Sequence, residues 1–318
     1  MALNNSKSLL LLCNTQCDIA CRYCFYTTGH EKRDSRKLSA HTAVSFAEKL
    51  LALGFSNVVL TGGDPLSRKY RSTALEVTKI FQEAGLTVII NSSGSHITDE
   101  DCDRIVEVNP FRVDVSVDSH LEEVHNGLRG RYADAIFLIK GLLARGYRSV
   151  VTTTVVSGKN ADTAADTIKF LRSLGVQDAR VQPVFLPGQD TAELKALELR
   201  LNERFFAELS DLYSSDSSRS FYPNYLKWWR QFYGDGQNAV VERPTCQMGK
   251  RTFVCDASGN ISACFHRSDV QLGNLMQDSL EDIQHKLNSH VLINDNLPGC
   301  VGKHCVSLFD HAGSWKTT

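Results

Sequence analysis

Six short segments between residues 8 and 186 are rich in Val, Ile or Leu, and each is bounded by polar or glycine-containing segments. These runs occupy residues 8–13, 57–61, 87–91, 112–117, 149–156 and 179–186. Runs of this length that are rich in Val, Ile and Leu predict buried strands, because a strand covered on both faces carries few polar positions. The pattern therefore predicts six strands, of which the first, at residues 8–13, is expected to be buried.

Helical patterns fill the intervals between these runs. Residues 38–53 carry apolar side chains at helical spacing, and Thr98 precedes the acidic first turn of a second helix. Further helices are predicted at residues 131–146 and 161–175. Regular alternation of strand and helix implies parallel strands joined by right-handed crossovers. Six such units predict an α/β fold, a partial (β/α)6 barrel, with its site at the carboxyl ends of the strands.

The remainder of the chain has a different composition. Residues 191–212 read as one long amphipathic helix, and an aromatic-rich stretch at 221–233 is more simply explained as core than as a ligand wall. We expect a barrel over residues 1–213, a linker and bridging segment over 214–240, and a small α+β domain over 241–318.

Charge and cysteine content narrow the class of protein. The net charge of −1 gives no reason to expect a nucleic-acid or membrane partner, and the N-terminal apolar run is too short for a signal peptide or a membrane span. The ten cysteines are clustered rather than dispersed. Clustering without a secretory signal favours metal ligation in a reducing compartment, and predicts a cytoplasmic protein.

Cys17, Cys21 and Cys24 lie in the run CDIACRYC, immediately after the first predicted strand. Three thiolates at this spacing can ligate three irons of a [4Fe–4S] cluster and leave the fourth iron open to a substrate. A structural zinc knuckle and an incomplete disulfide set are the alternatives. Zinc requires a fourth ligand, for which His30 is the local candidate.

The second strand runs directly into Gly62-Gly63-Asp64-Pro65. With the CxxxCxYC loop after the first strand, this order resembles the radical S-adenosylmethionine (SAM) superfamily. The resemblance implies a partial barrel that binds SAM and a [4Fe–4S] cluster, and that receives electrons from a reductase such as flavodoxin or ferredoxin. It also implies cleavage of SAM to a 5′-deoxyadenosyl radical that abstracts a hydrogen atom from a small-molecule substrate.

The resemblance also implies roles for individual residues. The glycine turn would bind the amino group of SAM, Tyr23 would lie near the adenine, and Arg129 would bind the carboxylate. Asp64 stands where many relatives have Glu. The implied SAM-binding set is Tyr23, Gly62, Gly63, Asp64, Asn91, Ser93, Ser116, Asp118 and Arg129.

The carboxyl-terminal cysteines resemble those of a twitch domain, a shortened SPASM domain that carries one auxiliary [4Fe–4S] cluster. The family pattern implies four ligands, namely Cys246, Cys264, Cys300 and Cys305. A zinc site with the same ligands is the alternative. Cys255 is left over, either as a packing residue or as a hydrogen-atom donor to a substrate radical.

Three activities follow from this resemblance. An epimerase acting on a sugar or aminoglycoside would use Cys255 as donor. A radical SAM alcohol dehydrogenase would need no donor. A peptide-modifying enzyme is the third, and the early first strand, near Ser8, leaves no room for an N-terminal peptide-recognition domain. We expect the epimerase, with a small polar substrate.

Overall fold

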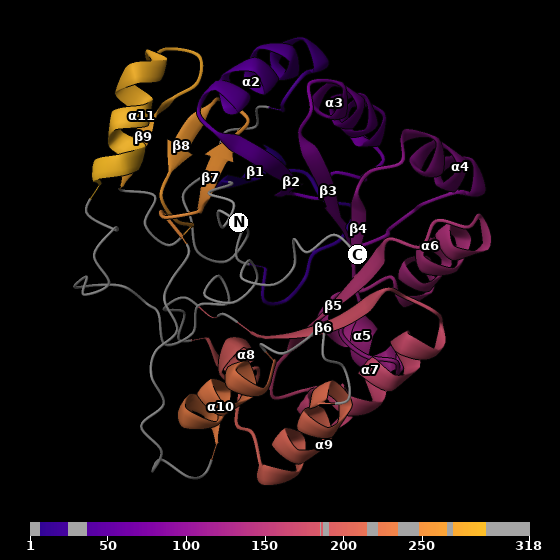
Figure 1. Cartoon of the computed structure of the whole chain (residues 1–318). Coiled ribbons are helices and arrows are strands. Elements are labelled where there is room, and N and C mark those ends of the chain that lie inside the picture. Colours follow the sequence, from indigo (N-terminus) through magenta and orange to yellow (C-terminus); the bar gives the residue numbers. More distant parts are fainter. Residues whose placement is uncertain are drawn as a thin grey trace.

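The computed structural model describes residues 7–24, 37–184, 186, 191–214, 222–234, 248–265 and 270–290. Strands and helices alternate through most of the chain (Figure 1). The strands are β1 (Lys7–Asn14), β2 (Phe55–Gly62), β3 (Thr87–Ser92), β4 (Arg112–Ser116), β5 (Val150–Val156), β6 (Asp178–Pro183), β7 (Thr252–Asp256), β8 (Asn260–Ser262) and β9 (Gln271–Asn274).

The helices between the strands and after them are α2 (Ala40–Ala52), α3 (Arg71–Glu83), α4 (Asp99–Val108), α5 (Glu122–Leu128), α6 (Tyr132–Ala144), η1 (Ala161–Thr163), α7 (Ala164–Ser173), α8 (Ala192–Lys195), α9 (Glu203–Ser214), α10 (Tyr222–Tyr233) and α11 (Leu280–Ser289). None of the helices in this described part of the chain is long and apolar enough to cross a membrane.

One curved sheet holds all of these strands, in the order β6-β5-β4-β3-β2-β1-β7-β8-β9. Strands β1 to β6 pair in sequence order and all in parallel. Helices α2, α3, α4, α6 and α7 lie along the outer side of the sheet (Figure 1). The predicted α/β fold with a partial (β/α)6 barrel is confirmed.

Side chains alternate between the two faces of the sheet. Leu9, Leu11 and Cys13 of β1 belong to the large hydrophobic cluster that also contains Phe46 and Leu50 of α2, which marks their face as the outer, helix-covered one. The inner face is more polar. It carries Asn91 and Asp114, which pair in register across β3 and β4.

The segment after α10 continues the same sheet. Strand β7 pairs in parallel with β1, and β8 and β9 add an antiparallel extension beyond it. The hairpin predicted for a separate small domain therefore forms the edge of the barrel sheet. The boundary between barrel and small domain remains a prediction, because the larger part of residues 241–318 lies outside the described residues.

The helix predicted over residues 191–212 is interrupted, so this prediction is wrong in its middle. Thr191 caps α8, which ends at Lys195, and α9 begins only at Glu203. Between them Leu201 forms a bridge to Gly234, with its amide bonded to the Tyr233 carbonyl at 2.7 Å. These tertiary bonds replace the helical ones.

The aromatic stretch forms α10, which packs against α9. Trp229 is fully buried and stacks on Phe205 with ring centroids 6.0 Å apart. Tyr225 and Tyr233 are also buried. The interpretation of this stretch as core is confirmed for these residues.

Candidate active site

The cysteine loop occupies residues 15–24, directly after β1. Cys17 is exposed, Cys21 and Cys24 are partly buried, and the Cys24 amide donates to the Cys21 carbonyl at 3.1 Å. The loop is fixed to the segment after β2, since Asp18 accepts a bond of 2.8 Å from the Arg68 amide. All three cysteines therefore lie at the carboxyl edge of the sheet, as predicted.

The three thiols lie within electrostatic reach of one another. The pKa of Cys17 is raised to about 12. The main cause is the loss of solvation on burial, and the negative charges of Asp64 and of the Cys24 and Cys21 thiolates add to it. Among the described residues no three His, Cys, Asp or Glu side chains converge closely enough to bind a single metal ion. His30, the local candidate for a fourth zinc ligand, lies outside the described residues. Three thiolates can each ligate one iron of a cubane, so the donor set fits a [4Fe–4S] cluster.

Gly62, Gly63 and Asp64 form a turn that is bonded directly to the start of the cysteine loop. The Gly63 amide donates to the Asn14 carbonyl and the Asp64 amide to the Gln16 carbonyl, both at 2.7 Å. Asn14 is fully buried, and its side chain donates to the Asp64 carbonyl at 3.2 Å and accepts from the Gln16 amide at 2.7 Å. The turn and the loop thus form one hydrogen-bonded unit.

This close approach explains the two glycines. A Cβ on Gly63 would lie 2.2 Å from the Gln16 carbonyl oxygen, and a Cβ on Gly62 would lie 2.5 Å from that of Asn14. Gly62 also has a φ of +113°, which L side chains rarely adopt. The close contact that the structure shows at these glycines is with the backbone of the cysteine loop. The contact with SAM that the resemblance implies for them stays a prediction.

The Asp64 carboxylate is occupied within the protein. It accepts bonds from the Leu66 amide, the Ser92 hydroxyl, and both the amide and the hydroxyl of Ser93. Asp64 and Ser93 therefore join the turn after β2 to the end of β3. The contribution of Asp64 to SAM binding stays a prediction.

Two buried side-chain oxygens near this edge, those of Gln16 and Asn91, accept no hydrogen bond from any of the described residues. An unpaired buried acceptor is costly, and such groups mark positions where a ligand supplies a donor. The ammonium group of SAM is a donor of this kind, so these residues fit SAM at this edge of the sheet.

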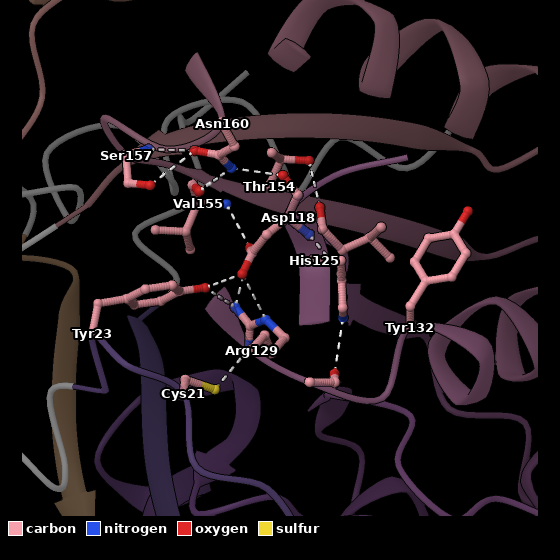
Figure 2. A network of polar contacts seen from close by, with 12 residues as sticks. Cys21, Tyr23, Asp118, His125, Arg129, Tyr132, Thr154, Val155, Ser157 and Asn160 are labelled. Atoms are coloured by element: carbon pink, nitrogen blue, oxygen red, sulfur yellow. Dashed lines mark hydrogen bonds and ion pairs between the residues drawn. The ribbon is translucent and has the colours of Figure 1, made fainter. Parts of the chain in front are cut away.

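Figure 2 shows a second cluster of polar side chains, at the ends of β4 and β5. Arg129 caps the carboxyl end of α5, and its Nε lies 3.1 Å from Oδ2 of the fully buried Asp118. Its Nη2 donates to the Tyr23 hydroxyl at 2.7 Å, and its Nη1 lies 3.6 Å from the Cys21 sulfur. Tyr23 also donates to Asp118.

Further residues hold Asp118 in place. Its Oδ1 accepts from the Val155 amide at 3.1 Å, and its carbonyl accepts from the Asn160 side chain at 2.6 Å. Its own amide donates to Nδ1 of His125 at 3.2 Å. These bonds come from β5, from the turn after it and from α5, so Asp118 is held on three sides (Figure 2).

His125 is buried and neutral in this arrangement. Since its Nδ1 accepts from the Asp118 amide, its Nε2 carries the proton and donates to the Gly130 carbonyl at 3.0 Å. Burial is the main cause that lowers the pKa of His125. Protonation of Nδ1 would break the bond to Asp118.

This lowered pKa predicts a loss of stability at acid pH. Below about pH 6.5 the unfolded chain binds a proton at this histidine while the folded chain does not, so the free energy of unfolding falls as pH decreases. We expect urea denaturation to show a smaller fall between pH 7.5 and 5.5 for His125→Gln than for wild type. His41→Gln, on the exposed face of α2, is the control. Equal slopes for wild type and His125→Gln would contradict the assignment.

The remaining predicted residues are placed as follows. Ser116 ends β4 and is partly buried beside Thr153 of β5. Cys264 lies just after β8 and packs with Met248 and Val254. Cys246, Cys300 and Cys305 lie outside the described residues.

Cys255 points to the opposite face of β7 from Val254. It is fully buried, pairs in register with Leu11 of β1, and belongs to the same hydrophobic cluster as Leu11 and Phe46. This is the helix-covered face, whereas Cys264 and Val254 share a separate cluster with Leu10 and Leu12. The placement favours the packing role for Cys255.

Sequence reasoning missed the residues that support the site. Asn14, His125 and Asn160 all hold functional elements together, yet none was predicted. Asn14 had a usable signal, since it is a polar residue at the end of a buried strand. His125 lies four residues before Arg129 in the same segment. Asn160 follows a strand in a turn, a position that polar residues often occupy for local reasons.

Comparison with known proteins agrees with this geometry. Residues 12–171 match the model of the radical SAM superfamily. The match spans half of the chain and includes both the cysteine loop and the glycine turn. The chain belongs to the radical SAM superfamily, whose members use SAM and a [4Fe–4S] cluster.

Two curated relatives extend the similarity. The sporulation killing factor maturation protein SkfB of Bacillus subtilis (strain 168) is 23% identical over 280 residues, which cover 87% of this chain and 64% of SkfB. The AdoMet-dependent heme synthase of Oleidesulfovibrio alaskensis is 25% identical over 267 residues, which cover 80% of this chain and 66% of that protein. The chain thus spans about two thirds of the length of these relatives.

Solved structures share the fold. Native anSMEcpe with bound AdoMet superposes with a TM-score of 0.65 at 14% identity, covering 91% of this chain and 84% of that one. Streptococcus suis SuiB bound to its precursor peptide SuiA gives a TM-score of 0.65 at 14% identity, covering 91% of this chain and 66% of SuiB.

Proposed function

We propose that this chain cleaves SAM at an open [4Fe–4S] cluster held by Cys17, Cys21 and Cys24, and abstracts a hydrogen atom from a carbon of a polar substrate. The observation that carries the proposal is the hydrogen-bonded unit of the cysteine loop and the glycine turn. This unit brings the loop that carries Cys17, Cys21 and Cys24 to the same edge of the sheet as the buried oxygens of Gln16 and Asn91, which have no partner among the described residues.

Each part of the edge has a separate task. When bound to the three thiolates, the cluster supplies the electron that splits SAM into methionine and a 5′-deoxyadenosyl radical. The backbone of Gly62, Gly63 and Asp64, with the unpaired oxygen of Asn91, would receive the ammonium group of SAM. Ser93, Ser116 and Asp118 lie on the neighbouring strand ends as candidates for polar contacts. Tyr23 and Arg129 would close the site from the cysteine loop and α5.

The inner face of the sheet carries two ion pairs. Arg112 and Asp114 form an ion pair on β4, with Nε and Oδ1 2.5 Å apart, and Arg180 and Asp178 form one on β6 at 2.9 Å. The two residues of each pair are two positions apart along the strand, so they lie on the same face, opposite to the buried Val113 and Ala179. Each pair includes the first residue of its strand, so it lies toward the end of the sheet opposite to the cysteine loop and does not mark the place of the substrate. The sugar or aminoglycoside substrate therefore rests on the family resemblance.

A peptide substrate is the second candidate. It rests on the relatives, since SkfB is named as a maturation protein and SuiB was solved with a precursor peptide. A substrate screen in deuterated water separates the outcomes. Deuterium gained without a change in redox state indicates epimerisation of a sugar or a peptide residue. Loss of two hydrogens indicates dehydrogenation, and the class of substrate consumed decides between small molecule and peptide.

The placement of Cys255 on the helix-covered face of the sheet disfavours a role as hydrogen donor in epimerisation. We expect Cys255→Ala to keep its iron, its SAM cleavage and its turnover, and to lose about 1 kcal/mol of stability through the small cavity left in the core. Product analysis with each substrate class checks this. If inverted product disappears while 5′-deoxyadenosine still forms, Cys255 is the donor and the packing role is wrong.

We further propose that Cys246, Cys264, Cys300 and Cys305 hold the auxiliary [4Fe–4S] cluster. The position of Cys264 supports this proposal, because Cys264 is buried with Met248 and Val254 and not in the helix-covered cluster that holds Cys255. Cys264→Ala is expected to lose about four irons per chain after anaerobic reconstitution and to keep the cluster at the cysteine loop. One zinc per chain in the wild type, with only about four irons, would replace this cluster by a zinc site.

A further inference from the structure

The ion pair between Arg129 and Asp118 connects the cysteine loop to the wall of the barrel. Asp118 follows β4, Arg129 follows α5, and both contact Tyr23 of the loop (Figure 2). The backbone adds a further link, since the Arg22 amide donates to the Leu128 carbonyl at 2.9 Å. The pair is therefore the point at which β4, α5 and the cluster loop meet.

Only one member of the ion pair, Arg129, contacts the proposed cluster ligand Cys21 directly. The Nη1 of Arg129 lies 3.6 Å from the Cys21 sulfur, within the range of an N–H···S hydrogen bond. The Asp118 carboxylate contacts Nε and Nη2 of the guanidinium, at 3.1 and 3.4 Å, and reaches the loop through the Tyr23 hydroxyl. The positive member of the pair thus touches a cluster ligand, and the negative member lies behind it.

Burial makes these charges effective. Asp118 has no exposed side-chain surface, and the side chain of Arg129 is only 11% exposed. Two charges in such a site act with little screening by solvent or salt. Reduction adds one negative charge to a cluster, so a nearby positive charge favours reduction and a nearby negative charge opposes it. Hydrogen bonds to the cluster sulfurs and net charge are both known to set cluster potentials.

We propose that Arg129 and Asp118 act as a positioning pair for the cluster at Cys21. Arg129 holds the Cys21 sulfur and eases reduction of the cluster, and Asp118 fixes the guanidinium and offsets part of its charge. This inference rests on the proposed function, because it requires a cluster at the cysteine loop. The proposed role of Arg129 does not depend on SAM and is separate from its predicted contact with the SAM carboxylate.

The pair makes a prediction that a purely structural role would not make. Arg129→Gln leaves the Asp118 charge without its partner and is expected to lower the midpoint potential of the cluster. Asp118→Asn leaves the Arg129 charge without its partner and is expected to raise it. The double variant removes both charges and is expected to return toward the wild-type value.

The experiment is a redox titration of the anaerobically reconstituted full chain, followed by electron paramagnetic resonance without SAM. A Cys264→Ala background leaves only the cluster of interest to be titrated. Arg131→Gln is the control, because Arg131 is two residues from Arg129 and forms an exposed ion pair with Asp134. Its potential is expected to equal that of the wild type.

Shifts of the two single variants in the same direction, or no shift in either, would overturn the proposal. Arg129→Lys keeps the positive charge but lacks the guanidinium group that contacts several partners at once. This variant tests the effect of charge if Asp118→Asn fails to fold. Only Arg129→Gln is then expected to lower the potential, and an equal fall for Lys and Gln would exclude the charge as the cause. If the variants show these shifts while the wild-type protein leaves SAM intact, the proposed function is refuted and the role of the pair is not.

Discussion

Replacing Cys17, Cys21 and Cys24 together by Ala is expected to abolish SAM cleavage and to remove about four irons per chain. These residues are the proposed ligands of the cluster that supplies the electron, so no other part of the chain can substitute for them. The neighbouring Asn14, Gly63 and Asp64 contacts use backbone and amide groups, so the fold is expected to survive the change. Iron analysis, circular dichroism and detection of 5′-deoxyadenosine check each part.

Cys102→Ala is the matched control for this variant. Cys102 is fully buried on α4 and lies against Gly141 of α6. It is expected to lose some stability and to keep the iron content and SAM cleavage of the wild type. If the triple variant retained full iron, the three-cysteine cluster would be refuted.

Gly63→Ala is expected to cost about 3 kcal/mol of stability and to weaken iron binding at the cysteine loop. The added Cβ would lie 2.2 Å from the Gln16 carbonyl and 2.4 Å from the Asn14 side-chain oxygen. Neither can move without breaking the bonds that join the turn to the loop. Chemical denaturation and iron content after reconstitution measure the two effects.

Gly127→Ala provides the comparison. Gly127 lies in α5, its φ is ordinary, and an added Cβ would meet nothing within 4 Å. Alanine is favoured over glycine in a helix by about 1 kcal/mol, so this variant is expected to be as stable as the wild type or more so. Equal losses in the two glycine variants would show that the contact with the loop is not the cause.

The barrel was predictable because its signals are local. Each of the strands β1 to β6 carries an apolar run bounded by polar residues, and Thr98 forms the predicted cap of α4 together with Asp101. The pairing of β7 with β1 joins residues more than two hundred positions apart. No local pattern indicates such a contact, so the sequence alone does not predict that this hairpin continues the barrel sheet.

The site was predictable to the extent that motifs define it. The cysteine loop and the glycine turn follow adjacent parallel strands, whose ends necessarily meet at one edge. The role of Arg129 as a ligand of SAM stays a prediction, and its partners among the described residues are Asp118, Tyr23 and Cys21. Ion pairing across a fold depends on which loops meet, and the sequence alone does not specify it. The face that Cys255 occupies follows from the alternation along β7, which only the register with β1 makes definite.

The most direct test of the central claim is the electron paramagnetic resonance spectrum of the reduced Cys264→Ala protein, recorded before and after addition of SAM. This background removes the signal of the auxiliary cluster. An open iron at Cys17, Cys21 and Cys24 predicts that SAM changes the spectrum of the remaining cluster. A reduced cluster whose spectrum is identical with and without saturating SAM would contradict the account.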